Sequence, residues 1–318
     1  MSDEILEIVK RRDRLNCGVS QGILGMSSRD PSGRWVGFDV DFARAIAAAV
    51  LGDAEKIEYV SLRPDYRFAA LVARAIDVLC CNATFTFARD VGLGISFAAI
   101  TCYDGETLIV RRDAGILRAQ DLGDAVVAFQ AGTTTQANLA RHLARHGIQF
   151  AARSYEMPQA ALDAYDAGEC TAYALDRIPL TGERLRLTRP EDHIILPETF
   201  SKEPMGPAVP GHDPSWRRLV GYVVHLVIEA EELGISSANL AHKRATNDFE
   251  LEHLIEVTDA HSRNLGVEPG WACRVLGQVG NYQEIFDRNL GAGSRLQVPR
   301  GQNELWTRGG LLYAVPFK

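Results

Sequence analysis

The chain has 318 residues and a formal net charge of −7, with 46% hydrophobic and 24% charged residues. This composition is typical of a globular protein and excludes disordered, collagen-like and coiled-coil chains. The length suggests two domains of roughly 150 residues each. The acidic balance argues against a general nucleic-acid binder, because such a protein needs a basic face to neutralise phosphates.

The sequence shows neither a membrane span nor a secretory signal. Its longest uncharged stretches, 91–103 and 219–228, are shorter than the roughly 18 residues that a span needs. Residues 1–10 begin with acids and lack an apolar segment. We expect either a cytoplasmic protein or the mature form of an exported one. The six cysteines show no metal or redox spacing. Cys80 and Cys81 end an apolar run and are expected to be buried free thiols, with any disulfide pairing left open.

Strand-like and helix-like runs alternate along the first two thirds of the chain. The patterns predict strands at 15–19, 56–62, 77–81, 125–129 and 171–175, and helices at 37–51, 66–75, 136–145 and 159–167. This order predicts an α/β fold with largely parallel sheets, in two successive units. Segments 107–112 and 198–207 are the predicted crossing points between the units. After residue 207 the sequence predicts helices at 216–233, 249–257 and 271–290.

The short sequence motifs that often mark catalytic, metal or nucleotide sites give no support for such a site here. Residues 18–22 match G-x-S-x-G, but the loop-like segment that follows differs from the helix of a hydrolase nucleophile elbow. His142 and His146 have a metal-binding spacing, yet arginines flank them and no third ligand lies nearby. Neither nucleotide-binding glycine motif is present. We therefore predict no catalytic residue, no metal and no cofactor.

Three predicted strand ends are more informative, because ligands of open α/β sheets bind at the carboxyl ends of strands. Arg89 follows the strand at 77–81, and its guanidinium matches a carboxylate, although it could instead pair with Asp90. Residues 130–135 place N–H and hydroxyl groups at a helix start, which is either an anion site or an ordinary threonine cap.

The third strand end is that of 171–175, which Asp176 follows directly. Its carboxylate either caps the next helix near Ile178 or, in a cleft, pairs with an ammonium group. Together the three strand ends offer one cation, one set of N–H donors and one carboxylate. A free amino acid needs this set, because each polar group that leaves water unpaired costs about 2–7 kcal/mol.

Eight segments give the sequence a resemblance to a known family. They are NCGVSQG (16–22), GRWVGFDVDFARAIAAAVLGD (33–53), DVLCCNATFTFARD (77–90), FQAGTTTQANLA (129–140), LDAYDAG (162–168), HIILPETFSKEPMGPAV (193–209), VGNYQEIFDRNLG (279–291) and RGGLLYAVP (308–316). In this order they resemble the periplasmic solute-binding proteins of polar amino acid ABC transporters, and most closely the general L-amino acid-binding branch. The resemblance covers nearly the whole chain.

This resemblance implies a two-lobed α/β clamp, the type II periplasmic binding protein or Venus-flytrap fold, with a two-strand hinge. Lobe 1 would comprise 1–107 plus 204–318, and lobe 2 would comprise 108–203. The clamp would close on a free L-amino acid and deliver it to an ABC transporter permease in the inner membrane. The implied location is the periplasm.

The resemblance also implies roles for individual residues. Arg89 would hold the ligand carboxylate, with help from Thr84 on lobe 1 and Thr133 on lobe 2. Asp176 would hold the α-ammonium group. The predicted ligand-binding set is Ser20, Gln21, Asn82, Thr84, Arg89, Thr133, Thr134 and Asp176.

Five positions depart from the pattern of that branch. Phe85 stands where tryptophan is common, and Ala83 where threonine is common. Glu169 and Thr171 replace an arginine and an aspartate. Arg177 follows Asp176 where glutamine is usual, and it is expected to alter the preference for the ligand side chain.

Two other classes of function stay open at this point. One is a dehydratase-like enzyme on the same fold, for which Glu169, His193 and Glu203 are the candidate acids. The other is a sensor module whose closure signals to a second protein. The sequence leaves the preferred side chain, the affinity and the oligomeric state open.

Overall fold

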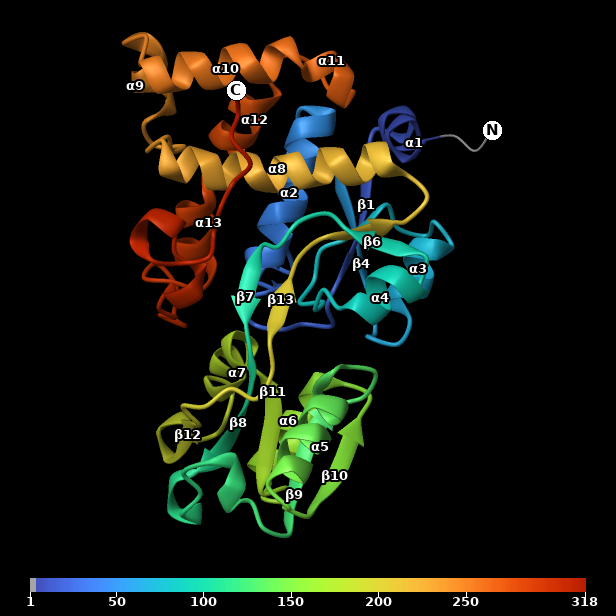
Figure 1. Cartoon of the computed structure of the whole chain (residues 1–318), viewed down its shortest axis with the longest axis vertical. Helices are drawn as coiled ribbons and strands as arrows, with labels where there is room; N and C mark the ends of the chain where they lie inside the picture. The colour runs from blue at the N-terminus through green and yellow to red at the C-terminus, as the bar shows by residue number, and fades with distance from the viewer. Residues whose placement is uncertain (1–3) are drawn as a thin grey trace.

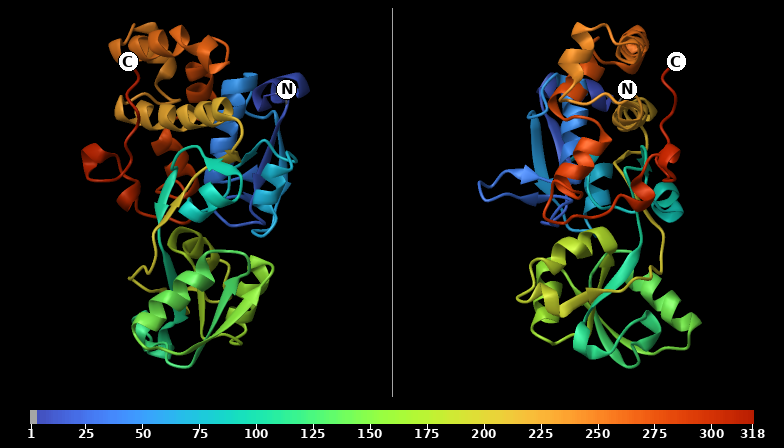
Figure 2. Two further views of the ribbon diagram at one scale, coloured as in Figure 1. Left: turned by 45° about the vertical axis from the view of Figure 1, so that its right-hand side comes forward. Right: turned by 90° about the vertical axis from the view of Figure 1, so that its left-hand side faces the viewer.

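The computed structural model describes residues 4–318 and shows two lobes stacked along the long axis of the molecule (Figure 1). Each lobe is built on its own five-stranded sheet. Two extended segments run side by side between the lobes, and a group of helices from the C-terminal third covers the larger, upper lobe (Figure 2).

The sheet of the upper lobe has the strand order β4-β1-β5-β14-β6. Strands β4, β1 and β5 are parallel, whereas β14 runs antiparallel to both β5 and β6. The strands are β1 (Leu15–Val19), β4 (Ile57–Ser61), β5 (Val78–Leu79), β6 (Ile95–Phe97) and β14 (Ala208–Pro210). The other elements are α1 (Ile5–Arg12), the hairpin β2 (Ser28–Arg29) and β3 (Trp35–Val36), α2 (Phe38–Leu51), α3 (Arg67–Val72) and α4 (Phe87–Gly92).

The lower lobe has the strand order β10-β9-β11-β8-β12. Its strands are β8 (Glu106–Arg111), β9 (Ala125–Gln130), β10 (Phe150–Tyr155), β11 (Ala172–Asp176) and β12 (His193–Ile195). Three α-helices, α5 (Thr135–Arg145), α6 (Pro158–Asp166) and α7 (Arg177–Arg184), pack around this sheet, and short 3₁₀ turns occupy Arg112–Ala114, Ala119–Asp121 and Pro190–Asp192. Buried apolar side chains form one cluster on each face of the sheet.

The two segments that join the lobes are β7 (Cys102–Asp104) and β13 (Glu203–Met205). They pair antiparallel, with Glu203 opposite Asp104 and Met205 opposite Cys102. The first crossing lies earlier than predicted, because most of segment 107–112 belongs to β8 and is buried in the lower sheet. The second predicted crossing, 198–207, contains β13.

Helices make up most of the chain after β14. They are α8 (Pro214–Glu232), α9 (Leu240–Ala245), α10 (Phe249–Ala260), α11 (Ser262–Leu265), α12 (Trp271–Gln278) and α13 (Tyr282–Asn289), followed by short turns at Gly301–Asn303 and Trp306–Arg308. The predicted single helix 271–290 is therefore wrong. Gly280 has φ +93°, and the Asn281 side chain caps α13 by accepting from the Glu284 N–H, so the first helix ends and a second begins.

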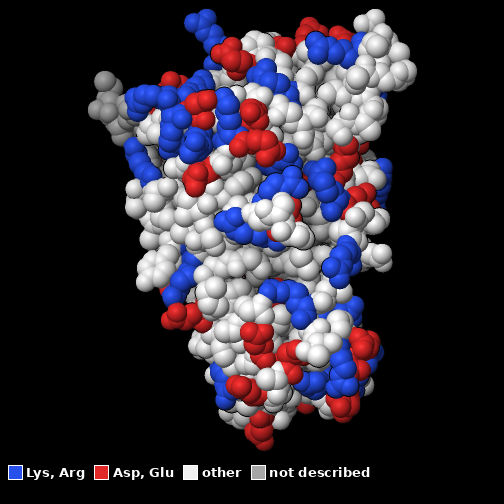
Figure 3. Space-filling model, turned by 180° about the vertical axis from the view of Figure 1, so that it is seen from behind, with Lys and Arg blue, Asp and Glu red and all other residues white. Residues whose placement is uncertain are grey.

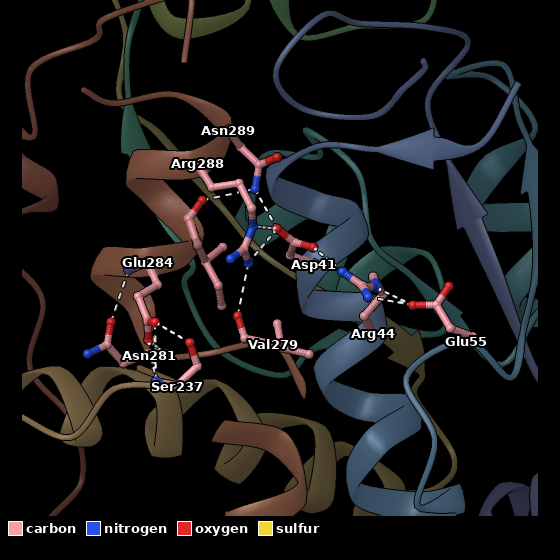
Figure 4. A network of polar contacts seen from close by, with 10 residues as sticks. Asp41, Arg44, Glu55, Ser237, Val279, Asn281, Glu284, Arg288 and Asn289 are labelled. Atoms are coloured by element: carbon pink, nitrogen blue, oxygen red, sulfur yellow. Dashed lines mark hydrogen bonds and ion pairs between the residues drawn. The ribbon is translucent and has the colours of Figure 1, made fainter. Parts of the chain in front are cut away.

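A polar network anchors these helices to α2 of the upper lobe (Figure 4). The Asp41 carboxylate accepts from Arg44 Nη1 at 3.2 Å, Arg288 Nε at 2.9 Å and Asn289 Nδ2 at 2.6 Å. Arg44 also pairs with Glu55. One buried carboxylate of α2 thus binds two residues at the end of α13.

The rear face of the molecule carries both signs of charge, mixed over the upper and lower lobes with uncharged surface between (Figure 3). Within residues 4–318, no helix combines the length and the apolar character that a membrane crossing requires.

Candidate functional site

A cleft lies between the lobes, at the carboxyl ends of β1 and β5 above and of β9 and β11 below. About 490 Å³ of space lies within it, open solvent included. All eight residues of the predicted set line this cleft: Ser20, Gln21, Asn82, Thr84, Arg89, Thr133, Thr134 and Asp176. The structure therefore brings together groups that are up to 156 positions apart in the sequence, and what they bind stays a prediction.

Arg89 lies in the first turn of α4, where its backbone N–H donates to the capping hydroxyl of Thr86 at 3.2 Å. Its Nη1 donates to the carbonyl oxygen of Thr84 at 2.9 Å, and its guanidinium lies 5.1 Å from the ring centre of Phe68. These contacts hold the side chain in the cleft and leave other N–H groups free to donate. Burial lowers the Arg89 pKa to about 10, and the neighbouring Arg67 adds to this effect.

The alternative in which Arg89 pairs with Asp90 is wrong. The Asp90 carboxylate accepts instead from the backbone N–H of Phe97 at 2.9 Å. Among residues 4–318, no carboxylate forms an ion pair with Arg89. Its charge is therefore available to an anionic ligand.

Asp176 is the last residue of β11, and α7 begins at the next residue. It does not cap this helix with its side chain. The cap comes from the linking strand β7, because Asp104 Oδ2 accepts from the Ile178 N–H at 2.8 Å. Asp176 as a whole residue is 7% exposed, and its carboxyl group receives no hydrogen bond from the part of the chain described. Burial raises its pKa well above the ordinary value, and the nearby Glu106, Asp104 and Glu203 raise it further.

The threonines of the site differ in what their hydroxyls already contact. Thr84 Oγ1 donates to Glu203. Thr133 Oγ1 donates to the Gln130 carbonyl oxygen at 2.8 Å, which secures the turn before α5. Thr134 has no side-chain cap bond, and its hydroxyl lies within 3.5 Å of both Glu106 and Glu203. The Thr133 hydroxyl accepts from the Thr135 N–H at 3.4 Å, so the threonine-cap interpretation stays open.

Ser20 and Gln21 follow β1. The Ser20 hydroxyl lies 2.6 Å from the Ser27 hydroxyl, within the loop that the sequence predicts here, and no helix follows it. Gln21 reaches the other lobe: its Oε1 accepts from Gln130 Nε2 at 3.2 Å, and its Nε2 lies 3.0 Å from Met157 Sδ. Gln21 therefore bridges the lobes as well as lining the cleft.

Sequence reasoning missed Arg67, which also lines the cleft. It is the first residue of α3 and only 5% exposed. Its Nη1 donates to Cys81 Sγ at 3.6 Å, while its Nε has no partner within the described chain. Two guanidinium groups thus face one cleft. Arg67 follows neither a glycine-rich turn nor a strand end, so its position at the cleft became apparent only from the structure.

The lobes touch each other at the edge of the cleft. Arg63 of the upper lobe pairs with Glu156 of the lower lobe at 2.8 Å. At Gly132, which has φ +75°, an added Cβ would lie 3.1 Å from the backbone nitrogen of Asp65. The structure is therefore a closed form of the clamp.

Two of the residues that differ from the pattern of the family branch, Phe85 and Arg177, do not line the cleft. Arg177 Nη2 donates to the carbonyl oxygens of Leu196 and Pro197 at 2.9 and 2.8 Å, so it secures a loop of the lower lobe. The Phe85 ring stacks on Phe97 with their centres 4.6 Å apart. The expected effect of Arg177 on the preference for the ligand side chain therefore stays a prediction.

The candidate acids of the enzyme alternative do not converge. His193 is buried in the lower lobe against the Tyr165 hydroxyl, at 2.6 Å. Glu169 is exposed and pairs with Arg153. Only Glu203 lies beside the cleft, where it is hydrogen-bonded to the hydroxyl of Thr84.

Two α/β lobes on a two-strand hinge, with an arginine that forms no ion pair and a carboxyl group that receives no hydrogen bond from the described residues in the closed cleft, define a ligand-binding clamp. Residues 15–306 match the model of the bacterial extracellular solute-binding proteins, family 3, and the chain belongs to this family. It is 41% identical over 315 residues to the general L-amino acid-binding periplasmic protein AapJ of Rhizobium johnstonii, covering 98% of this chain and 92% of that one.

Two further relatives cover almost the whole chain. The glutamate/glutamine/aspartate/asparagine-binding protein BztA of Rhodobacter capsulatus is 37% identical, covering 100% of this chain and 94% of that protein. A solved ABC transporter periplasmic binding protein from Brucella ovis, with glutathione bound, is 38% identical with a TM-score of 0.95 and covers 99% of this chain and 100% of that one. The chain is thus a solute-binding protein of this family, with the two-lobed periplasmic binding protein fold.

Proposed function

We propose that the cleft holds a free L-amino acid by both of its charged ends. Arg89 binds the α-carboxylate together with donors near Thr84 and Thr133, and Asp176 binds the α-ammonium group. The observation that carries this proposal is that two polar groups of the cleft lack partners within residues 4–318. Arg89 has no carboxylate partner, and the buried Asp176 receives no hydrogen bond. A zwitterion supplies both missing partners.

We further propose that the ligand side chain carries a carbonyl or carboxylate oxygen. Arg67 is buried in the cleft lining and its Nε has no partner in the described chain. An oxygen of the ligand would accept from it, since a buried donor left unpaired costs about 1–3 kcal/mol. The names of BztA and of the glutathione-bound Brucella protein support a ligand of this kind.

We propose that closure presents the loaded lobes to an ABC transporter permease in the inner membrane, and that the protein works in the periplasm. The names of AapJ and BztA support this partner and this location. The lobes are related by a hinge of two short strands, which suits a rotation between an open and a closed state. The sensor alternative shares all of these features, and reconstitution with the permease separates the two.

We propose that the bound ligand leaves unchanged, with no reaction in the cleft. Two of the three candidate acids, Glu169 and His193, are placed away from it. Prolonged incubation of the protein with its ligand, followed by NMR of the ligand, tests this point. Appearance of a dehydrated product would support the enzyme alternative.

The central test is calorimetry with a panel of the twenty L-amino acids on protein that has been unfolded and refolded to remove carried-over ligand. We expect heat with polar amino acids, above all glutamine, glutamate, asparagine and aspartate. Asp176→Asn should weaken binding about 30-fold to 4,000-fold, because loss of one partner of a buried charge pair costs about 2–5 kcal/mol.

The matched control is Asp192→Asn, the same substitution at a half-buried position of the same lobe that does not line the cleft. It should bind as the unmodified protein does. Absence of heat with every amino acid, or equal binding by Asp176→Asn, would overturn the proposal.

A further inference from the structure

Three buried carboxylates meet where the lobes join. Glu106 of β8, Asp176 of β11 and Glu203 of β13 each place an oxygen within 4.8 Å of the others. Glu106 is 0% exposed and Glu203 is 2% exposed. Glu203 lies on a linking strand, whereas Asp176 lines the ligand cleft.

A neutral amide, and not a cation, bridges two of these acids. Asn138 Nδ2 donates to Glu106 Oε2 and to Glu203 Oε1, at 2.8 Å each. The nearby Arg141 donates to the Asn138 oxygen and does not pair with an acid of the cluster. None of the three carboxylates forms an ion pair with another part of the described chain.

Three buried carboxylates at this spacing cannot all carry a charge, because like charges in a medium of low dielectric constant repel strongly. Burial raises the pKa of Glu106 to about 7, and Glu203 contributes to this shift. In the closed form without ligand, the cluster therefore holds protons near neutral pH. The protons belong to the group of acids as a whole.

Glu203 also connects the cluster to both lobes. It accepts from the Thr84 hydroxyl of the upper lobe and from Asn138 of the lower lobe, and Thr134 Oγ1 lies 3.4 Å from it. A change of charge in the cluster therefore alters hydrogen bonds to residues of both lobes. This makes Glu203 a positioning residue for the threonines.

We propose that binding of the ligand ammonium group at Asp176 is coupled to release of one proton from the cluster of Glu106, Asp176 and Glu203. The proton leaves a carboxyl oxygen and passes to the buffer, and the carboxylate that remains pairs with the ammonium group. This inference rests on the proposed function. The other charged or titratable groups that face the cluster from packed elements are Arg67, Arg89, Cys102, Asp104, Arg141, Tyr173 and Arg177.

The direction of the effect follows from linkage. If binding releases a proton, a higher pH favours binding, so the affinity should rise between about pH 6 and pH 8. The limit is tenfold per pH unit for one proton. Above that range the ligand ammonium group itself begins to lose its proton and the gain ends.

The experiment is calorimetry at pH 7 in phosphate and in Tris, with the L-amino acid that binds most tightly in the panel above. The two buffers differ in ionisation enthalpy, so the difference between the observed heats counts the protons released. We expect a release of about one proton from the unmodified protein. Equal heats in the two buffers would overturn the inference while leaving the proposed function intact.

Glu203→Gln removes one negative charge from the cluster with little change of shape, and it should lower the number of protons released. A residue with a merely structural role would change the affinity but not this number. Glu169→Gln is the matched control, since Glu169 is exposed on the lower lobe, and it should release as many protons as the unmodified protein. If Glu203→Gln does not fold, Glu106→Gln replaces it, and an unchanged proton count overturns the inference. Absence of binding by every amino acid would instead overturn the proposed function.

Discussion

Gly182 gives a direct test of whether ligand binding closes the lobes as far as the structure shows. It lies in α7 of the lower lobe, and a Cβ at this position would be 2.7 Å from the backbone oxygen of Leu24 in the upper lobe and 3.2 Å from its Cβ. Ile178 of the same helix belongs to the core cluster of the upper lobe. The substitution Gly182→Ala therefore forces the two lobes apart by several tenths of an ångström.

The same substitution should not harm α7 itself. Alanine is a better helix former than glycine by roughly 0.5–1 kcal/mol. Overpacking of a close contact costs about 1–3 kcal/mol, and this cost applies only to the closed form. We expect the affinity for the ligand to fall about 5–150-fold, whereas the ligand-free protein unfolds at the same or a higher denaturant concentration.

Calorimetry measures the first effect and guanidinium unfolding of the ligand-free protein measures the second. Thr181→Ala is the control, because it also raises helix propensity one residue away in α7 but adds no atom toward Leu24. If Gly182→Ala bound the ligand as tightly as the unmodified protein, the bound state could not have the lobe contact described here.

Three further outcomes follow from single contacts. Arg89→Lys should weaken binding about 10–100-fold while leaving the protein folded, because an ammonium group lacks the planar fork that matches a carboxylate; calorimetry checks this. Burial raises the pKa of Asp39 to about 8 and the pKa values of Asp104 and Glu106 to about 7, so the stability that these protonated groups contribute is present below about pH 4 and is lost as the pH rises through 7–8. Burial lowers the pKa values of His142, His193 and His225. These histidines make the folded protein less stable only as the pH falls below about 6.5. The free energy of unfolding without ligand should therefore fall between pH 6.5 and pH 8.5, and an increase over this range would contradict these shifts. Asp41→Ala should lower the free energy of unfolding by about 1–3 kcal/mol, since it removes the buried acceptor shared by Arg44 of α2 and by Arg288 and Asn289 at the end of α13; denaturant unfolding measures this loss.

The sequence predicted the polar strand ends because the rule behind them is local. Arg89 and Asp176 each follow a short apolar run, and the carboxyl ends of such strands meet at one edge of a sheet. Resemblance to the family then assigned them to one cleft. The bounds of β1 were correct for a similar reason, since its apolar run stops at a polar loop.

The features that sequence reasoning missed depend on contacts between distant segments. Segment 107–112 was predicted to cross between the lobes. Its apolar side chains instead belong to the two core clusters on opposite faces of the lower sheet, as expected for a central strand. Arg67 begins a helix whose pattern gives no indication of a cleft. The cap of α7 comes from Asp104, which is 74 positions before Ile178, so no local rule for helix starts could identify it.

This distant cap has a consequence for binding that can be tested. Asp176 directly precedes α7, which is the position from which an aspartate ordinarily caps a helix. It is available to a ligand because Asp104 already occupies the Ile178 N–H. Asp104→Ala leaves that N–H without a partner, and the Asp176 carboxylate can then rotate to accept from it.

Asp104→Ala should therefore weaken ligand binding although Asp104 is absent from the cleft lining. Loss of a cap costs about 0.5–2 kcal/mol, so the competition by the new cap should reduce the affinity about 2–30-fold. Asp104→Asn keeps an oxygen for the Ile178 N–H and should show a smaller loss. Hydrogen exchange of the Ile178 amide reports whether the cap is replaced: a protected amide with weakened binding supports the competition, whereas a protected amide with unchanged affinity shows that Asp176 is not the group that holds the ligand.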